Sequence, residues 1–365
     1  METRHNPVEL AVRQLAAYDA VRRRRGAWFE RLGLKPRRVP SRVLWTGPRA
    51  RLLAYHDARA TGAALLLLPA PIKRAYIWDL VPAVSVIRRC AEAGLRVHLL
   101  EWTDPTEADA GLGLRDHLEG VIAPALEAML AATSERQAVL AGHSLGGTLA
   151  ALTAALHPER VAALGLIETP LRFGRETGAL GPLVAAAPDA TMAALGRACV
   201  PGSFLTLSAL SAAPDAFFAE PWLDWVASAG APAAQIHLRV RRWTSDELAM
   251  PGALFVDIVE GLYRDDRFAR RALRVDGRLA DPRPLTHIPT LAVVQPHSRV
   301  VPPSSALGLF AELPMRDLRV VDYDGEIGVA LQHVGALVGP AAHRRLWPQI
   351  LSWIEARAPT GAGVQ

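Results

Sequence analysis

One run of five residues, Gly142-His143-Ser144-Leu145-Gly146, restricts the fold of this chain more than any other feature. The apolar stretch 137–141 before it is typical of a buried strand, and residues 147–157 after it are typical of a helix. In a sharp strand-to-helix turn, the residues two before and two after the central one approach too closely for side chains, so both must be glycine. The pattern therefore predicts a turn that presents Ser144 above the edge of a sheet.

The surrounding sequence alternates between strand-like and helix-like segments. Strands are expected at 63–68, 96–102, 137–141, 161–167, 290–294 and 318–323, and helices at 84–93, 114–132, 147–157 and 342–356. Such alternation is typical of a mostly parallel sheet with helices on both faces. With the serine turn after the third of these strands, it predicts the α/β-hydrolase fold.

The rhythm is interrupted between residues 171 and 285, where the sequence is rich in Ala, Pro and Trp and is helical where it is periodic. We expect this segment to be a helical cap inserted into a core formed by residues 43–170 and 286–358. Residues 1–42 are expected to be an appended helical segment that begins at Asn6-Pro7, and residues 359–365 a disordered tail. The basic cluster 22–25 ends the appended helix and favours either packing on the main domain or contact with an anionic or lipid surface.

Composition excludes several classes of protein. Half of the 365 residues are hydrophobic, which is enough for a large core, yet no apolar run reaches the length of about 18 to 20 residues that a bilayer requires. The net charge is +5, but acidic residues are interspersed with the basic ones along the chain, so nucleic acid is not an expected partner. Cys90 and Cys199 have neither a metal-ligand nor a disulfide spacing. We therefore expect a cytoplasmic protein that needs neither a metal nor another cofactor.

A serine in such a turn is a candidate nucleophile if a base removes its proton and two N–H groups bind the oxyanion that forms on attack. The amide of Leu145, at the start of the next helix, is the first expected donor. The second should come from the turn after the strand at 63–68. Pro71 has no N–H group, so Ile72 is expected there, with Ala70 as the alternative.

The expected general base is His333, in a loop beyond the last strand. His343, on the final helix with one side facing solvent, and His297, past the preceding strand, are weaker candidates, and His143 is expected only to pack. The acid partner is less obvious, because the loop 295–299, its commonest source, contains no carboxylate. Glu168 directly follows the strand at 161–167 and is the preferred replacement, with Asp324 and Glu326 as alternatives.

Many further segments resemble polyhydroxyalkanoate synthases. In chain order they are 75–80 (AYIWDL), 85–86 (SV), 94–97 (GLRV), 101–105 (EWTDP), 146–149 (GGTL), 157–161 (HPERV), 169–173 (TPLRF), 250–251 (MP), 262–264 (LYR), 301–303 (VPP), 333–335 (HVG) and 346–348 (LWP). The resemblance runs in order from about residue 43 to 354. It implies an enzyme that acts on hydroxyacyl esters or coenzyme A thioesters beneath a hydrophobic lid, to which Trp222, Trp225 and Trp243 would belong.

The chain departs from these synthases where their chemistry occurs. Ser144 stands in place of the synthase cysteine, Ser298 in place of the usual aspartate, and Arg172 in place of a common aspartate. A serine favours hydrolysis over thioester exchange. We therefore expect a serine hydrolase of hydroxyalkanoate-type esters or thioesters; a synthase-like acyltransferase and a non-catalytic acyl-binding homologue are the alternatives. The resemblance implies a polyester granule surface, a second copy or a second subunit as partners.

Overall fold

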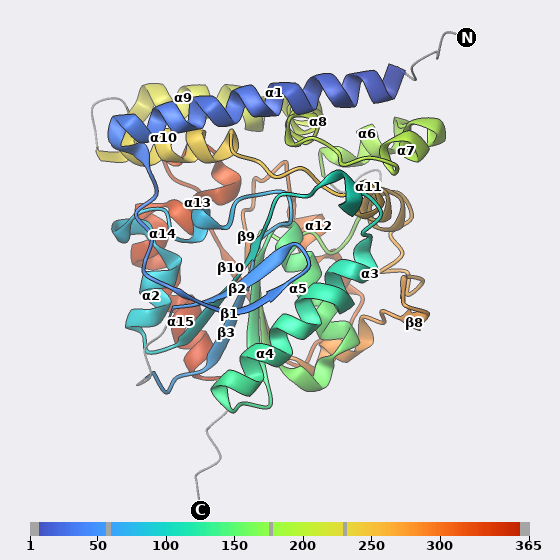
Figure 1. Cartoon of the computed structure of the whole chain (residues 1–365). Helices are drawn as coiled ribbons and strands as arrows, with labels where there is room; N and C mark the ends of the chain where they lie inside the picture. Colours follow the sequence, from blue (N-terminus) through green and yellow to red (C-terminus); the bar gives the residue numbers. More distant parts are fainter. Residues whose placement is uncertain (1–6, 56–59, 175–177, 229–231, 358–365) are drawn as a thin grey trace, which may run out of the picture.

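The computed structural model describes residues 7–55, 60–174, 178–228 and 232–357, which fold around one large sheet (Figure 1). Its strands are β1 (Arg42–Gly47), β2 (Ala50–Ala54), β3 (Ala64–Leu68), β4 (Arg96–Trp102), β5 (Ala138–His143), β6 (Val161–Ile167), β9 (Thr290–Val294) and β10 (Leu318–Asp322). Their order is β1-β2-β4-β3-β5-β6-β9-β10, and every neighbouring pair from β4 onward is parallel. Only β2 runs antiparallel to both of its neighbours. The predicted fold class is confirmed.

Successive residues of a strand point to opposite faces, so a strand covered on both sides is apolar throughout. In β3, Leu65 and Leu67 belong to one core and Leu66 and Leu68 to the other. The first core is completed by α2 (Val86–Glu92), α13 (Gly335–Val338), α14 (Pro340–Arg345) and α15 (Trp347–Glu355). The second is completed mainly by α3 (Leu114–His117), α4 (Ala123–Thr133), α5 (Leu145–Leu156) and α12 (Pro303–Ala311).

Two helices are less regular than the sequence predicted. The helix expected over 114–132 is interrupted by a π-helical turn, η5 (Leu118–Ile122), between α3 and α4. The helix expected over 342–356 is two helices, α14 and α15, which meet at Leu346. Pro348 has no N–H group and therefore sits in the first turn of α15, where none is needed.

The segment between β6 and β9 forms helices above the carboxyl ends of the strands (Figure 1). They are α6 (Leu180–Ala186), α7 (Asp189–Leu195), α8 (Gly202–Ala212), η7 (Asp215–Ala219), α9 (Glu220–Ser228), α10 (Pro232–Thr244), α11 (Gly252–Val256) and η8 (Asp257–Arg264). The sequence did not predict the small hairpin that follows, β7 (Arg274–Val275) and β8 (Arg278–Leu279). Asp276 and Gly277 form its turn at φ values of 52° and 77°, a conformation that favours this residue pair.

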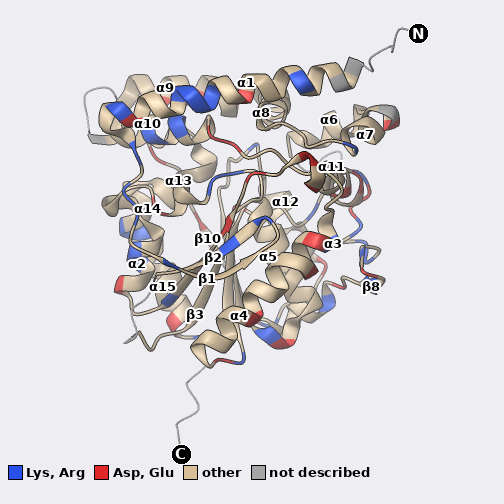
Figure 2. Ribbon diagram, viewed as in Figure 1, with Lys and Arg blue, Asp and Glu red and all other residues tan. Residues whose placement is uncertain are grey.

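The amino-terminal helix α1 (Pro7–Phe29) continues into η1 (Glu30–Leu34) and lies across the cap, against α7 and α8 (Figure 1). Lys and Arg residues lie along α1 and α10 (Figure 2). The expected capping residue Asn6 and the expected tail 359–365 lie outside the described residues. Of the helices within the described ranges, none combines the length and apolar content that crossing a membrane requires.

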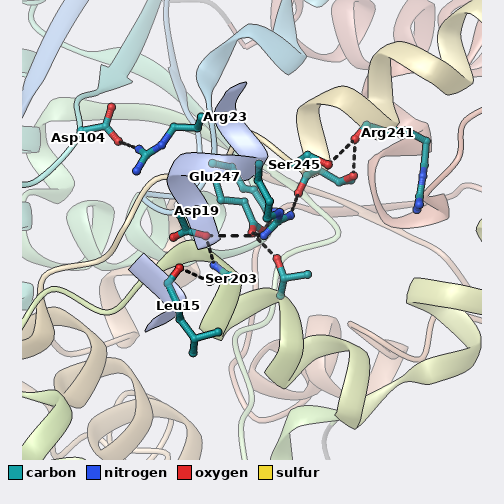
Figure 3. Close-up of polar contacts among 12 residues, drawn as sticks. Leu15, Asp19, Arg23, Asp104, Ser203, Arg241, Ser245 and Glu247 are labelled. Carbon is teal, nitrogen blue, oxygen red and sulfur yellow. Dashed lines mark hydrogen bonds and ion pairs between the residues drawn. The ribbon is translucent and has the colours of Figure 1, made fainter. Parts of the chain in front are cut away.

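Side-chain contacts fix α1 to the cap (Figure 3). Asp19 accepts a hydrogen bond of 2.9 Å from the amide of Ser203, whose hydroxyl donates to the carbonyl of Leu15. Arg22 donates to Glu247 at 3.3 Å and to the carbonyl of Thr244 at 2.9 Å. The first arginine of the basic cluster is therefore used for packing within the chain.

Candidate active site

The turn between β5 and α5 has the sharp geometry that its glycines predict. Ser144 has φ 54° and ψ −132°, a conformation that is strained for a residue with a side chain. A Cβ atom at Gly142 would lie 2.5 Å from the carbonyl oxygen of Gly146, and one at Gly146 would lie 2.0 Å from the carbonyl oxygen of Leu68. Both contacts are with backbone, which cannot move aside, so both positions require glycine.

The close approach at Gly146 brings the start of α5 against the turn that follows β3. In that turn, the amide of Lys73 donates to the carbonyl of Ala70 at 3.1 Å, and the carbonyl of Ile72 accepts a bond of 3.1 Å from Leu248 in the cap. Leu145, Ile72 and Ala70 line the same cavity as Ser144. Their location is compatible with the predicted oxyanion donors, and those roles remain a prediction.

Glu168 and His333 come together beside this turn. Nδ1 of His333, in η10 (Gln332–Val334), lies 3.1 Å from Oε2 of Glu168. Glu168 follows the last residue of β6, and its amide donates to the carbonyl of Val293 in β9 at 2.8 Å. At the usual acid position, the hydroxyl of Ser298 accepts a bond from the amide of Val301. The expected pairing of His333 with Glu168 is thus present in the geometry.

Burial dominates the electrostatics of this pair. Glu168 has no exposed surface, and burial raises the pKa of its carboxyl to about 8. Burial also lowers the pKa of His333 to about 4, with a smaller contribution from the positive charge of Lys73. Among the described residues, Oε1 of Glu168 has no hydrogen-bond partner. A site of this kind favours the neutral forms of both groups over a separated pair of charges.

His143 holds the backbone of His333. Its Nε2 donates to the carbonyl of His333 at 2.6 Å, and the two rings lie 4.6 Å apart between centroids. Burial, together with the neighbouring imidazole of His333, lowers the pKa of His143 to about 3, so that the ring is neutral. The sequence assigned only packing to His143, and no signal in it indicated this hydrogen bond.

The two weaker base candidates lie in different surroundings from His333. His343 was expected to face solvent on the final helix; this is wrong, because it is buried on α14, where it donates to the carbonyl of Leu337 and accepts from Arg89. His297 is exposed on the loop after β9. It lines a second cavity, of about 520 Å³, which His333 also borders.

The alternative acids are also placed differently from Glu168. Glu326 accepts bonds of 2.7 and 2.8 Å from the amides of Ala341 and Ala342 and so caps α14. Asp324 is exposed and borders the second cavity. Neither arrangement resembles the contact between Glu168 and His333.

Ser144, Leu145, Ile72 and His333 open into a cavity of about 970 Å³ between the sheet and the cap. The cap contributes mostly apolar side chains to it, among them Val184, Met192, Phe204, Leu205, Phe255 and Tyr263. All three tryptophans expected in a lid line this cavity, but differently: Trp243 is buried, Trp225 is half-buried and Trp222 is 63% exposed. The cavity is close to the upper end of the usual range for ligand pockets.

The sequence model of the alpha/beta hydrolase fold family matches residues 65–326. Among solved structures, a hydrolase from Pseudomonas aeruginosa PA01 superimposes with a TM-score of 0.52 at 18% identity, covering 86% of this chain and 98% of that one. A putative non-heme bromoperoxidase from Mycobacterium tuberculosis H37Rv gives 0.52 at 15% identity, covering 85% and 97%. At these identities, the structures show a common fold. The chain therefore belongs to the α/β-hydrolase fold family.

Within this family of enzymes, the chain is similar to poly(3-hydroxyalkanoate) polymerase subunits. It is 28% identical to the PhaC subunit of Haloferax mediterranei over 89% of this chain and 65% of that protein. It is 25% identical to the PhaC subunit of Allochromatium vinosum over 84% of this chain and 86% of that protein. The chain spans just under two thirds of the length of the Haloferax protein. The resemblance to polyhydroxyalkanoate synthases is confirmed.

Proposed function

We propose that the protein is a serine hydrolase that cleaves hydroxyalkanoate-type esters or thioesters through an acyl-enzyme. The observation that carries this proposal is the 3.1 Å contact between Nδ1 of His333 and Oε2 of Glu168, in a site where Ser144 occupies a strained turn and borders the same cavity as His333. A carboxylate on Nδ1 selects the imidazole tautomer whose Nε2 can accept a proton. Glu168 thereby supplies what the loop 295–299 lacks.

In the proposed mechanism, Nε2 of His333 takes the proton of Ser144 as the serine oxygen attacks the acyl carbonyl. The amides of Leu145 and Ile72 donate to the oxyanion of the tetrahedral intermediate. His333 then returns the proton to the departing alcohol or thiol, and the acyl group remains on Ser144. His333 then deprotonates a water molecule that attacks this ester, and it returns the proton to the oxygen of Ser144 as the hydroxy acid leaves, which restores the free serine.

The apolar cavity supports an acyl substrate. Its cap side offers few charged groups, and a volume of about 970 Å³ accommodates an extended acyl chain or a short oligomer. The similarity to poly(3-hydroxyalkanoate) polymerase subunits favours a hydroxyacyl unit over a simple fatty acyl chain. We accordingly propose oligomeric or coenzyme A-linked hydroxyalkanoates as the substrate class.

Hydrolysis of short p-nitrophenyl esters and labelling by a fluorophosphonate test the proposal. The wild-type protein should turn over the ester and be labelled at Ser144, and Ser144→Ala should lose both properties. Turnover retained by Ser144→Ala would exclude Ser144 as the nucleophile. An unlabelled, inactive wild-type protein would favour the non-catalytic acyl-binding alternative.

A second candidate, acyl transfer to a hydroxyl group, is favoured by the relatives, which are named as polymerases. It uses the same acyl-enzyme and differs only in the acceptor. Incubation with a hydroxyacyl-CoA distinguishes the two, because hydrolysis releases free hydroxy acid and transfer produces oligomers.

A further inference from the structure

A carboxylate in the cap, Asp224, is hydrogen-bonded to the loop that precedes the proposed base, His333. Asp224, on α9, is buried and accepts hydrogen bonds from the amides of Gly328 at 2.6 Å and Ala330 at 2.8 Å. Its Oδ2 also lies 2.7 Å from Nδ1 of His237 on α10. One side chain therefore links two cap helices to a segment more than one hundred residues further along the chain.

The two amides belong to a strained part of the core. Gly328 has φ 92° and Ala330 has φ 61°. Glycine adopts positive φ values freely, but alanine rarely does because it has a side chain. A Cβ atom at Gly328 would lie 2.6 Å from that of Ala233 in α10, so the loop packs directly beneath the cap. Such a conformation persists only where other contacts enforce it. The contacts with Asp224 are of that kind.

His333 follows this loop directly. Ala330 and His333 both line the main cavity, and the amide of Val334 donates to the carbonyl of Leu331 at 3.1 Å, which joins the loop to η10. A change in the backbone at residue 330 would therefore be transmitted to His333 within one turn. Nδ1 of His333 would then lose its alignment with Glu168.

We propose that Asp224 is a positioning residue for His333, so that the base is in place only while the cap is docked on the core. This inference rests on the proposed role of His333. A carboxylate suits the task, because it only accepts hydrogen bonds and three donors converge on it. Asp224→Asn would place an NH₂ group against at least one of these donors and would release the loop.

His237 provides the competing explanation. It lines the main cavity, and its Nδ1 contact with Asp224 resembles the pairing of His333 with Glu168. If His237 itself served as a base, Asp224 would matter through His237 and not through the loop. The hydrogen bonds that Asp224 accepts from the two backbone amides favour the positioning role, since they do not involve His237.

Two measurements on Asp224→Asn test the proposal: hydrogen exchange of peptides covering 326–336, and fluorophosphonate labelling of Ser144, separated into its maximal rate and its half-saturating concentration. We expect faster exchange in this segment and a maximal labelling rate lower by about tenfold or more, with little change in half-saturation. The control is Asp215→Asn. Asp215 is also a cap carboxylate paired with the core, through Arg299, but it is only partly buried, and its replacement should alter neither measurement.

Unchanged exchange at 326–336 in Asp224→Asn would overturn the proposal, whatever happens to labelling. So would a His237→Phe variant that loses labelling as strongly as Asp224→Asn while its loop exchange stays as in the wild type. An unlabelled wild-type protein would defeat the proposed function, yet the exchange comparison would still decide whether Asp224 holds the loop. If Asp224→Asn does not fold, Asp224→Glu provides the same comparison, because it displaces the carboxylate by one methylene.

Discussion

Ser144 and Glu168 occupy equivalent positions on neighbouring parallel strands. His143 pairs with Ile167 in the register of β5 and β6, and each candidate residue follows directly. Both have positive φ values, 54° for Ser144 and 43° for Glu168, and the amide of Ser144 donates to the carbonyl of Ile167 at 3.0 Å. The sheet thus presents a serine hydroxyl and a carboxyl group side by side, and His333 approaches them from another loop.

Activity should keep rising with pH up to a higher pH than the pKa of an ordinary carboxyl or imidazole group would give. While Glu168 is protonated, its O–H donates to Nδ1 of His333. The proton of the neutral ring then sits on Nε2, so Nε2 cannot accept the proton of Ser144. Since burial raises the pKa of Glu168 to about 8, the productive form accumulates as pH increases toward that value. The profile of kcat/KM from about pH 6 to about pH 10, corrected for spontaneous hydrolysis, measures this. A plateau already reached at the acidic end would contradict it.

Glu168→Gln should lower kcat by about 10³- to 10⁴-fold, because an amide does not stabilise the imidazolium that forms during attack. Asp324→Asn is the control, since Asp324 is an exposed acid that the sequence also nominated, and it should retain wild-type activity. Equal losses in the two variants would mean that Glu168 has no special role.

The same Glu168→Gln variant should be more stable than the wild type in alkali. The pKa of Glu168 is raised in the fold from 4.5 to about 8, so its contribution to stability is complete below pH 4.5 and is lost as pH rises through about 8. Gln does not ionise. The difference in Tm between the variant and the wild type should therefore grow between these two pH values and then level off; a pH-independent difference would refute the assignment.

Gly146→Ala should destabilise the protein by about 3 kcal/mol or more, because the new Cβ atom would lie 2.0 Å from the backbone oxygen of Leu68. Gly120→Ala is a matched control. Gly120 lies in η5 with no atom within 4 Å of the added Cβ, so the substitution should be neutral or stabilise by about 0.5 to 1 kcal/mol. Urea unfolding compares the two, and tolerance of Gly146→Ala would contradict the geometry of the turn.

Two adjacent arginines of α1 should differ in their contributions to stability. Arg22→Ala removes a partly buried partner of Glu247 and should cost about 1 to 2 kcal/mol. Arg23→Ala removes an exposed pair with Asp104 and should cost less than about 0.5 kcal/mol. Denaturant unfolding of both variants, under identical salt conditions, provides the measurement, and equal costs would show that the contact with Glu247 does not fasten α1.

Ser144→Cys should shift product formation from free hydroxy acid toward oligomer when a hydroxyacyl-CoA is supplied. A thiolate exchanges with thioesters more readily than an alkoxide and is a better leaving group when the acyl chain passes to an acceptor. Mass spectrometry of the products gives the ratio. An unchanged ratio would mean that features of the cavity other than the nucleophile decide between water and a hydroxyl acceptor.

The sheet and its edge were predictable where local pattern and turn chemistry act together. β6 and β9 have the expected bounds, and the strand end before Glu168 indicated its position beside Ser144. The hairpin of β1 and β2 was missed, because its two-residue turn, Pro48-Arg49, contains neither the glycine nor the asparagine typical of hairpin turns, although Arg49 adopts φ 62°. The contacts of His143 with His333, and of Asp224 with Gly328, join residues more than one hundred positions apart. The periodicity of a sequence indicates local structure, and it does not predict contacts between residues that lie so far apart in the chain.

The position of α1 has a practical consequence for handling the protein. This helix covers the cavity, with Arg22 and Phe29 among the lining residues, whereas α15 ends at the opposite end of the molecule from the cap (Figure 1). An affinity tag or a solid support joined through the carboxyl-terminal end leaves this helix untouched. The same attachment at the amino-terminal end would constrain the helix that covers the cavity, so under the proposed function the two orientations of the immobilised protein should differ in the length of acyl ester that they hydrolyse.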